Sequence, residues 1–72
     1  MVAGLLFDSI EDFNVVNDRV TVAAKQVYEL DNYSLPVEVN GKYFMQVVMG
    51  YEQFFTEEEL NSLVDYFEIK NA

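Results

Sequence analysis

The dipeptide Asn40-Gly41 constrains the fold of this chain more than any other feature of its sequence. It lies between two runs that are rich in β-branched and aromatic residues, 37–39 and 42–48. Both central residues of a type I′ turn need a positive φ, which Asn and Gly adopt more readily than other residues. The pattern therefore predicts a β-hairpin with Asn40 and Gly41 as its two-residue turn.

The turn also fixes which residues of the two strands face one another. Its register sets three pairs opposite each other: Val39 and Lys42, Glu38 and Tyr43, and Val37 and Phe44. One face then carries Leu35, Val37, Val39, Phe44 and Val48, and the other carries Glu38, Tyr43, Met45, Val47 and Met49. A hairpin with one side in water has one polar face, whereas both faces here are largely apolar. We therefore expect a helix, the N-terminal strand or another molecule to cover the second face.

A helix is expected over residues 10–28, before the hairpin. Ser9 offers an N-cap, and apolar residues recur at three- and four-residue spacing along the segment. The alternating β-branched segment 20–22 leaves a second interpretation open, in which the helix breaks near Asn17-Asp18 and the chain continues as a strand.

A second helix is expected over residues 57–68. Thr56 and Glu59 match a capping box, in which each side chain accepts a hydrogen bond from the other residue's backbone amide. The apolar positions of this helix should face inward: Leu60, Leu63, Val64 and Phe67. Residues 2–7 form an apolar run suited to a buried strand or a packed N-terminal arm. The order β-α-β-β-α predicts an α+β domain, with two helices packed on a short antiparallel sheet.

Length and composition limit how such a domain can be stabilised. The 72 residues form one domain, 1–72, and the chain has no cysteine and no histidine. Disulfides and thiolate or imidazole zinc sites are therefore excluded. The hydrophobic content of 51% favours a folded chain over a disordered acidic one. This content also leaves more apolar surface than the core of so small a domain can bury, so we expect a homo-oligomer.

The formal net charge of −9 bears on the class of partner. Binding to nucleic acid depends on phosphate neutralisation by Lys and Arg, so direct nucleic-acid binding is disfavoured, and an anionic membrane surface is disfavoured for the same reason. A field of this sign attracts basic protein surfaces. The alternative interpretation is that the charge only keeps a small apolar domain in solution.

The residue types present argue against catalysis. The most frequent general base, His, and the best nucleophile, Cys, are both missing, and three glycines are too few for a phosphate-binding loop. We expect a non-enzymatic protein without a cofactor or a metal. The sequence has no run of 18 apolar residues that could span a bilayer. Its apolar start, residues 2–7, lacks a basic n-region and is shorter than the core of a signal peptide. We therefore expect a cytoplasmic location, in the host cytoplasm if the protein is viral.

Candidate partner-binding residues fall into two groups. The first group contains carboxylates that lie off the apolar stripe of each expected helix: Glu11, Asp18, Glu57, Glu58, Asp65 and Glu68. Spread over a surface, such carboxylates can stand in for phosphates, as in proteins that mimic nucleic acid. The second group supplies apolar or aromatic anchors: Tyr66 beside the acids, and Tyr43 and Met45 on the second hairpin face.

Three segments carry a resemblance to a known group of proteins. The run LLFDSIEDFNVVNDRV, the hairpin segment VNGKYFMQVV and the segment TEEE are similar, in this order, to segments of small uncharacterised acidic bacteriophage proteins. Those proteins open with a DSIEEFN-type helix. The resemblance covers most of the chain in outline, implies a viral origin and carries no functional residues across.

Two functions follow as expectations. The first is a phage-encoded inhibitor or modulator that docks on a basic surface of a host protein. The alternative is a structural or assembly protein that packs through its apolar hairpin face into a homo-oligomer or a virion. Binding by charge should weaken with salt, whereas an oligomer built on apolar area should not.

Overall fold

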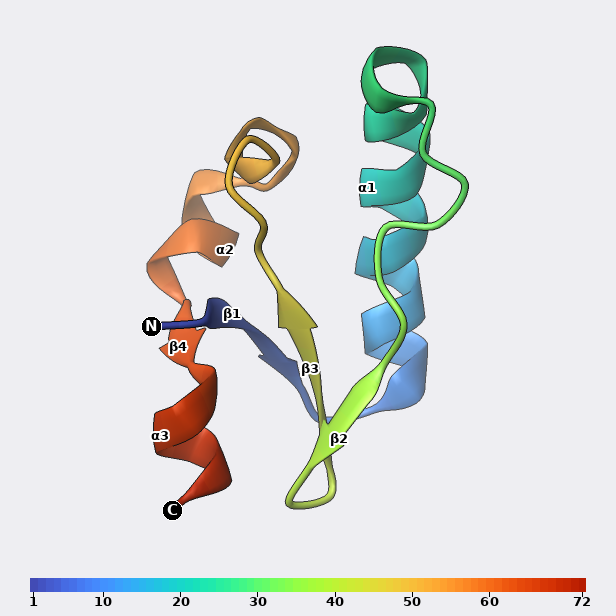
Figure 1. Cartoon of the computed structure of the whole chain (residues 1–72). Helices are drawn as coiled ribbons and strands as arrows, with labels where there is room; N and C mark the ends of the chain where they lie inside the picture. The colour runs from blue at the N-terminus through green and yellow to red at the C-terminus, as the bar shows by residue number, and fades with distance from the viewer.

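A four-stranded antiparallel sheet lies at the centre of the computed structural model, which describes all residues from Met1 to Ala72 (Figure 1). The strands are β1 (Ala3–Phe7), β2 (Val37–Val39), β3 (Lys42–Gln46) and β4 (Val64–Asp65), and they are ordered β2-β3-β1-β4. Three α-helices and one 3₁₀ helix complete the chain: α1 (Ile10–Tyr28), η1 (Glu52–Phe54), α2 (Glu57–Asn61) and α3 (Tyr66–Lys70). The predicted α+β class is confirmed.

The hairpin forms as its turn chemistry predicts. Asn40 and Gly41 have φ values of 53° and 81°, the positive values that a type I′ turn needs. The three predicted pairs are all present: Val37 with Phe44, Glu38 with Tyr43, and Val39 with Lys42. The apolar N-terminal run is a strand and not a packed arm, because β1 pairs along β3 from Gly4 to Phe7.

Helix α1 runs without a break through Asn17-Asp18. Ser9 caps it by accepting a hydrogen bond of 3.2 Å from the Asp12 amide, and Glu29 ends it in the left-handed conformation. Val20 belongs to the β-branched segment for which a strand was the alternative interpretation. It is fully buried on the inner side of the helix. Burial against the sheet therefore overrides the weak local preference for a strand.

Asn17 also has a structural reason to be inside this helix. Its side chain is nearly buried, and its Nδ2 donates a hydrogen bond of 2.8 Å to Asn32 Oδ1. Its Oδ1 accepts from the Ser34 amide at 3.0 Å. About one helical turn further along the same side, Thr21 Oγ1 accepts from the Tyr33 amide at 2.9 Å. These contacts attach the loop between α1 and β2 to the helix.

A helix covers the second hairpin face, which is one of the three covers expected, so this face is not available for the self-association that the structural alternative requires. Met45 is fully buried, in a core with Phe13 and Val20 of α1, and Tyr43 and Val47 pack against this core as half-buried residues. Helix α1 covers this face because its own apolar side, from Phe13 to Ala24, needs the same burial. The chain itself supplies the cover that the apolar face requires.

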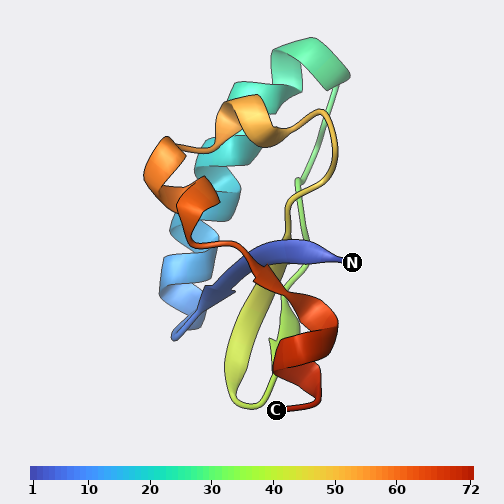
Figure 2. The same ribbon diagram turned by 90° about the vertical axis from the view of Figure 1, so that its left-hand side faces the viewer.

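The expected helix over residues 57–68 is also wrong, although its capping box is confirmed. Thr56 Oγ1 accepts from the Glu59 amide at 3.1 Å, and Glu59 Oε1 accepts from the Thr56 amide at 2.9 Å. The helix then stops at Asn61, and Val64 pairs with Gly4 of β1. Figure 2 shows this segment crossing beside β1 between α2 and α3.

The end of β4 starts the last helix. The Tyr66 amide donates to the Val2 carbonyl at 2.8 Å, and the Asp65 carboxylate caps α3 by accepting from the Phe67 amide at 2.8 Å. Pairing with β1 thus replaces the intrahelical hydrogen bonds that a continuous helix would make. The predicted inward stripe breaks up with it, since Leu63 is 37% exposed and Phe67 is 53% exposed.

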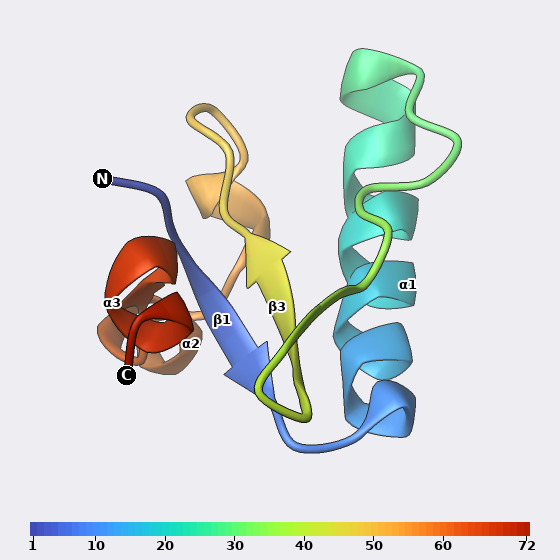
Figure 3. The same ribbon diagram turned by 60° about the horizontal axis from the view of Figure 1, so that its bottom comes forward.

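The sheet lies between α1 and α3, as Figure 3 shows most clearly. On the side of α3, the Phe44 ring contacts the Tyr66 ring at a centroid distance of 5.2 Å. Asn40 Nδ2 donates to the Ile69 carbonyl at 2.9 Å, which joins the hairpin turn to the end of α3. Both faces of the hairpin therefore contact helices of the same chain.

Aromatic rings fill one end of the molecule, where α1 ends near η1. Tyr33 is at the centre, with its ring 5.2 Å from that of Tyr51 and 5.7 Å from that of Phe55. Its hydroxyl donates to the Gln46 carbonyl at 2.7 Å and accepts from the Val48 amide at 3.0 Å. The Tyr33 hydroxyl thus binds the backbone of the last residue of β3 and of a residue just beyond it.

Candidate functional site

Most carboxylates of the chain point into solvent without a cationic partner. All of them are exposed except Glu59 and Asp65, which are half-buried. The chain forms two ion pairs, Arg19 with Glu59 at 2.6 Å and Lys42 with Asp8 at 3.1 Å. The remaining acids leave the negative charge of the molecule uncompensated on its surface.

Two of the predicted acids form a stripe with exposed valines on α1. The side chains of Glu11 and Asp18 are exposed and make no hydrogen bond or ion pair within the chain. Val15 and Val22 follow them by four residues each, on the same side of the helix, and are 69% and 74% exposed. We call these four residues the α1 stripe. It combines unpaired negative charge with exposed apolar area on one side of the helix.

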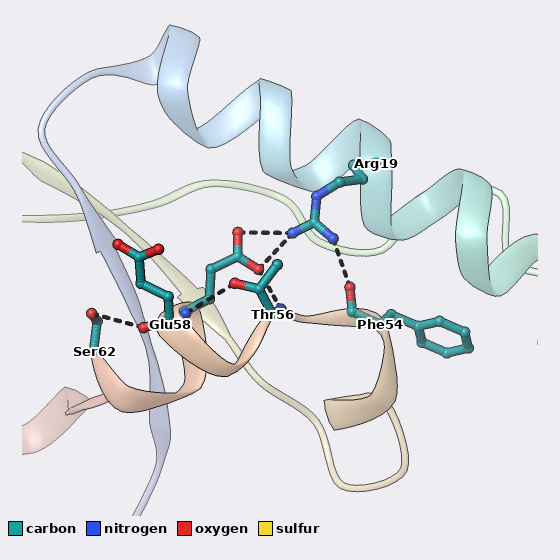
Figure 4. A network of polar contacts seen from close by, with 6 residues as sticks. Arg19, Phe54, Thr56, Glu58 and Ser62 are labelled. Carbon is teal, nitrogen blue, oxygen red and sulfur yellow. Dashed lines mark hydrogen bonds and ion pairs between the residues drawn. The ribbon is translucent and has the colours of Figure 1, made fainter.

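The Arg19 network fixes α2 against α1 (Figure 4). Arg19 Nη2 donates to both carboxylate oxygens of Glu59, at 2.6 and 2.8 Å, and its Nη1 donates to the Phe54 carbonyl at 2.7 Å. Glu59 is also the second partner in the Thr56 capping box. The predicted acids Glu57 and Glu58 therefore lie on a helix turn that is held next to the middle of α1.

Glu59 was absent from the predicted site. The capping box signalled its contact with Thr56, but no sequence pattern pairs it with Arg19, which is 40 positions away. This contact neutralises one carboxylate of α2 and leaves Glu57 and Glu58 without a partner.

Four of the predicted partner-binding residues do not have the free side chains that were expected. Met45 is fully buried in the core, and Tyr43 packs half-buried beside it. Tyr66 is half-buried and its ring contacts that of Phe44, so it is not a projecting anchor. The Asp65 carboxylate caps α3. Glu68 lies on α3 and is exposed, as predicted.

A groove between β1 and α2 was not predicted, because it exists only where the expected helix 57–68 breaks. Its volume is about 510 Å³, and its lining includes Leu6 and Phe7 of β1 together with Glu58 and Ser62. A second groove, of about 270 Å³, lies on the α3 side of the sheet and is almost entirely apolar. Glu58 is the predicted site residue that the structure brings to the larger groove.

The structure contains no cluster of three or more acidic side chains that could hold a metal ion. None of its helices combines the length and the hydropathy required to cross a bilayer. No known protein family matches the chain, and no curated protein and no solved structure gives a significant match.

Proposed function

We propose that this chain is a non-enzymatic acidic protein that docks on a basic surface of a larger protein and inhibits or modulates it. In the phage setting that the resemblance implies, the larger protein belongs to the host. The observation that carries the proposal is the set of outward carboxylates that have no cationic partner in the chain. Such a surface attracts a basic partner over long range and raises the rate of association.

Charge alone gives too little affinity for this role. An exposed ion pair contributes about 0.2–1 kcal/mol, so several pairs must act together with apolar contacts. The α1 stripe can supply both ion pairs and apolar contacts, because Val15 and Val22 add apolar area beside Glu11 and Asp18. A 19-residue helix also holds these side chains in a fixed array, which lowers the entropy lost on binding. A regular array of carboxylates is what mimicry of nucleic acid requires.

The alternative function is that of a structural or assembly protein. Its predicted interface is now part of the core, but the smaller groove on the α3 side offers another one. Val37 and Phe67 line this groove and are 43% and 53% exposed. Packing two copies there brings together two chains of charge −9, and this repulsion is why we propose the alternative second.

The test is affinity capture from host lysate with a charge-reversed variant beside the wild-type chain. Reversal of Glu11, Asp18 and Glu57 to Lys removes the α1 stripe acids and one α2 acid without touching a cap or an ion pair. The matched control reverses Glu29, Asp31 and Glu38, which changes the net charge equally at other positions. Mass spectrometry identifies the retained proteins, and circular dichroism checks the fold.

We expect the control to retain a host protein that the stripe variant loses. Equal loss in both variants would mean that net charge alone acts and that no defined surface exists. Retention by both variants would contradict the proposal, because the acids would then be dispensable.

A further inference from the structure

Strand β1 is paired along only part of its second edge. It pairs with β3 from Gly4 to Phe7, but β4 reaches only Ala3 and Gly4. The Ala3 carbonyl accepts from the Val47 amide on the β3 side. Because the backbone groups of an antiparallel strand alternate between its two edges, the N–H and C=O of Leu6 point to the edge that β4 leaves open.

The open edge faces the groove between β1 and α2. Leu6 and Phe7 of β1 line it together with Glu58 and Ser62. Figure 4 shows the side chains of Glu58 and Ser62 at α2. The Glu58 carboxylate makes no ion pair and accepts no hydrogen bond within the chain, while its neighbour Glu59 is occupied by Arg19. The groove thus combines an unpaired strand edge with an uncompensated negative charge.

We propose that this groove binds an extended basic segment of the partner protein. The segment adds to the sheet beside β1, exchanges backbone hydrogen bonds with Leu6 and directs a Lys or Arg side chain to Glu58. In strand addition, main-chain hydrogen bonds give the affinity and contacts with alternate side chains of the added strand give the specificity. This inference rests on the proposed function and names the part of the partner that is bound.

Charge identifies the occupant as a basic partner and not a second copy of this chain. The carboxylate at the groove lacks a cation, and the chain as a whole carries −9, so another copy would bring more negative charge. A strand that carries Lys or Arg instead supplies the missing cation, and the pair is then a charge-assisted hydrogen bond.

The opposite edge of the sheet is less suited to strand addition. Strand β2 is three residues long, and only the backbone of Glu38 points away from β3, because Val37 and Val39 bond within the hairpin. Pro36 precedes it and has no N–H to donate, a common means of protecting an edge strand. No groove includes Glu38.

The experiment uses the ¹⁵N-labelled chain and a capped hexapeptide, Arg-Val-Arg-Val-Arg-Val, as the probe. Two isomers carry backbone N-methyl groups on the odd or on the even residues, which blocks one hydrogen-bonding edge of the peptide and keeps its charge. We expect the parent peptide to shift the Leu6 amide and to slow its hydrogen exchange. One N-methylated isomer should keep this effect, and the other, blocked on the edge that faces β1, should lose it.

Substitutions in α2 test the charged contact. Glu58→Gln should weaken peptide binding roughly tenfold, the loss expected for one charge-assisted hydrogen bond. Glu57→Gln is the matched control, since Glu57 is exposed on the same helix turn but does not line the groove. We expect it to weaken binding no more than about twofold, by the general change in charge.

Three outcomes would contradict the proposal that this groove binds an extended basic segment. Equal binding of the parent and both N-methylated isomers, with shifts spread over many acids, would leave binding by charge intact and remove strand addition. A Leu6 amide that moves with protein concentration alone would make a second copy the occupant. Absence of any shift of the Leu6 amide at millimolar peptide would show that the groove does not bind such a segment. The capture experiment would still test the proposed function separately.

Discussion

At the scale of single residues, Gly4 occupies the tightest position between β1 and β3. A Cβ built there lies 2.5 Å from Phe44 Cζ and 2.9 Å from Gln46 Cα, and it also meets the Met45 carbonyl. Because two of these contacts are backbone atoms, the strands must separate to admit it. We predict that Gly4→Ala lowers the free energy of unfolding, measured by urea denaturation, by about 2–3 kcal/mol, the upper part of the range for overpacking. Gly41→Ala, where a Cβ meets open space, should cost about 1 kcal/mol, from its φ of 81° alone. Equal losses would contradict the crowding at Gly4.

Tyr33 couples stability to alkaline pH. Burial raises the pKa of its hydroxyl above the ordinary value of 10.0. The folded state thus binds this proton more tightly than the unfolded state does, so the contribution is present below about pH 10 and is lost as pH rises through the raised pKa. We predict that the unfolding free energy of the wild type falls more steeply above pH 10 than that of Tyr33→Phe. Parallel curves, measured by urea denaturation from pH 8 to 11.5, would refute this coupling.

At the scale of elements, the sequence predicts what local chemistry determines. The hairpin follows from the φ preferences of Asn40 and Gly41, and α1 follows from its cap and its apolar period. The break after α2 depends on the pairing of Val64 with Gly4, sixty positions away, which no local pattern contains. The candidate site likewise has features that local patterns predict and features that depend on contacts between distant segments. The exposure of Glu11 and Glu57 follows from helix periodicity, whereas the burial of Met45 depends on where α1 packs, and the groove beside Glu58 depends on the break after α2.

The start of α2 is an element whose stability can be measured directly. The Thr56 hydroxyl accepts a hydrogen bond from the Glu59 amide, which has no partner within the helix, and the Glu59 side chain also binds Arg19. We predict that Thr56→Ala costs about 1 kcal/mol in the free energy of unfolding, while Thr56→Ser, which keeps the hydroxyl, costs a few tenths. A loss in Thr56→Ser as large as that in Thr56→Ala would mean that packing of the threonine methyl, and not the cap, is responsible.

At the scale of the whole molecule, uncompensated charge works against the folded state. The chain carries −9 and forms only two ion pairs, both exposed enough to contribute little. Salt screens the repulsion among the acids more than it weakens those pairs. We predict that the free energy of unfolding rises between 20 and 500 mM NaCl, concentrations chosen to span Debye lengths from about 20 to about 4 Å. A lower stability at high salt would show that attractive ion pairs dominate the surface.

The affinity for the captured partner as a function of salt tests the central claim, docking by surface charge, most directly. Isothermal titration calorimetry at NaCl concentrations of about 50 and about 300 mM compares long-range with strongly screened electrostatics. We predict that the dissociation constant of the wild-type chain rises at least roughly tenfold across this range. The variant with Glu11, Asp18 and Glu57 reversed to Lys should bind weakly at both concentrations. A wild-type affinity that stays the same from low to high salt would contradict the claim.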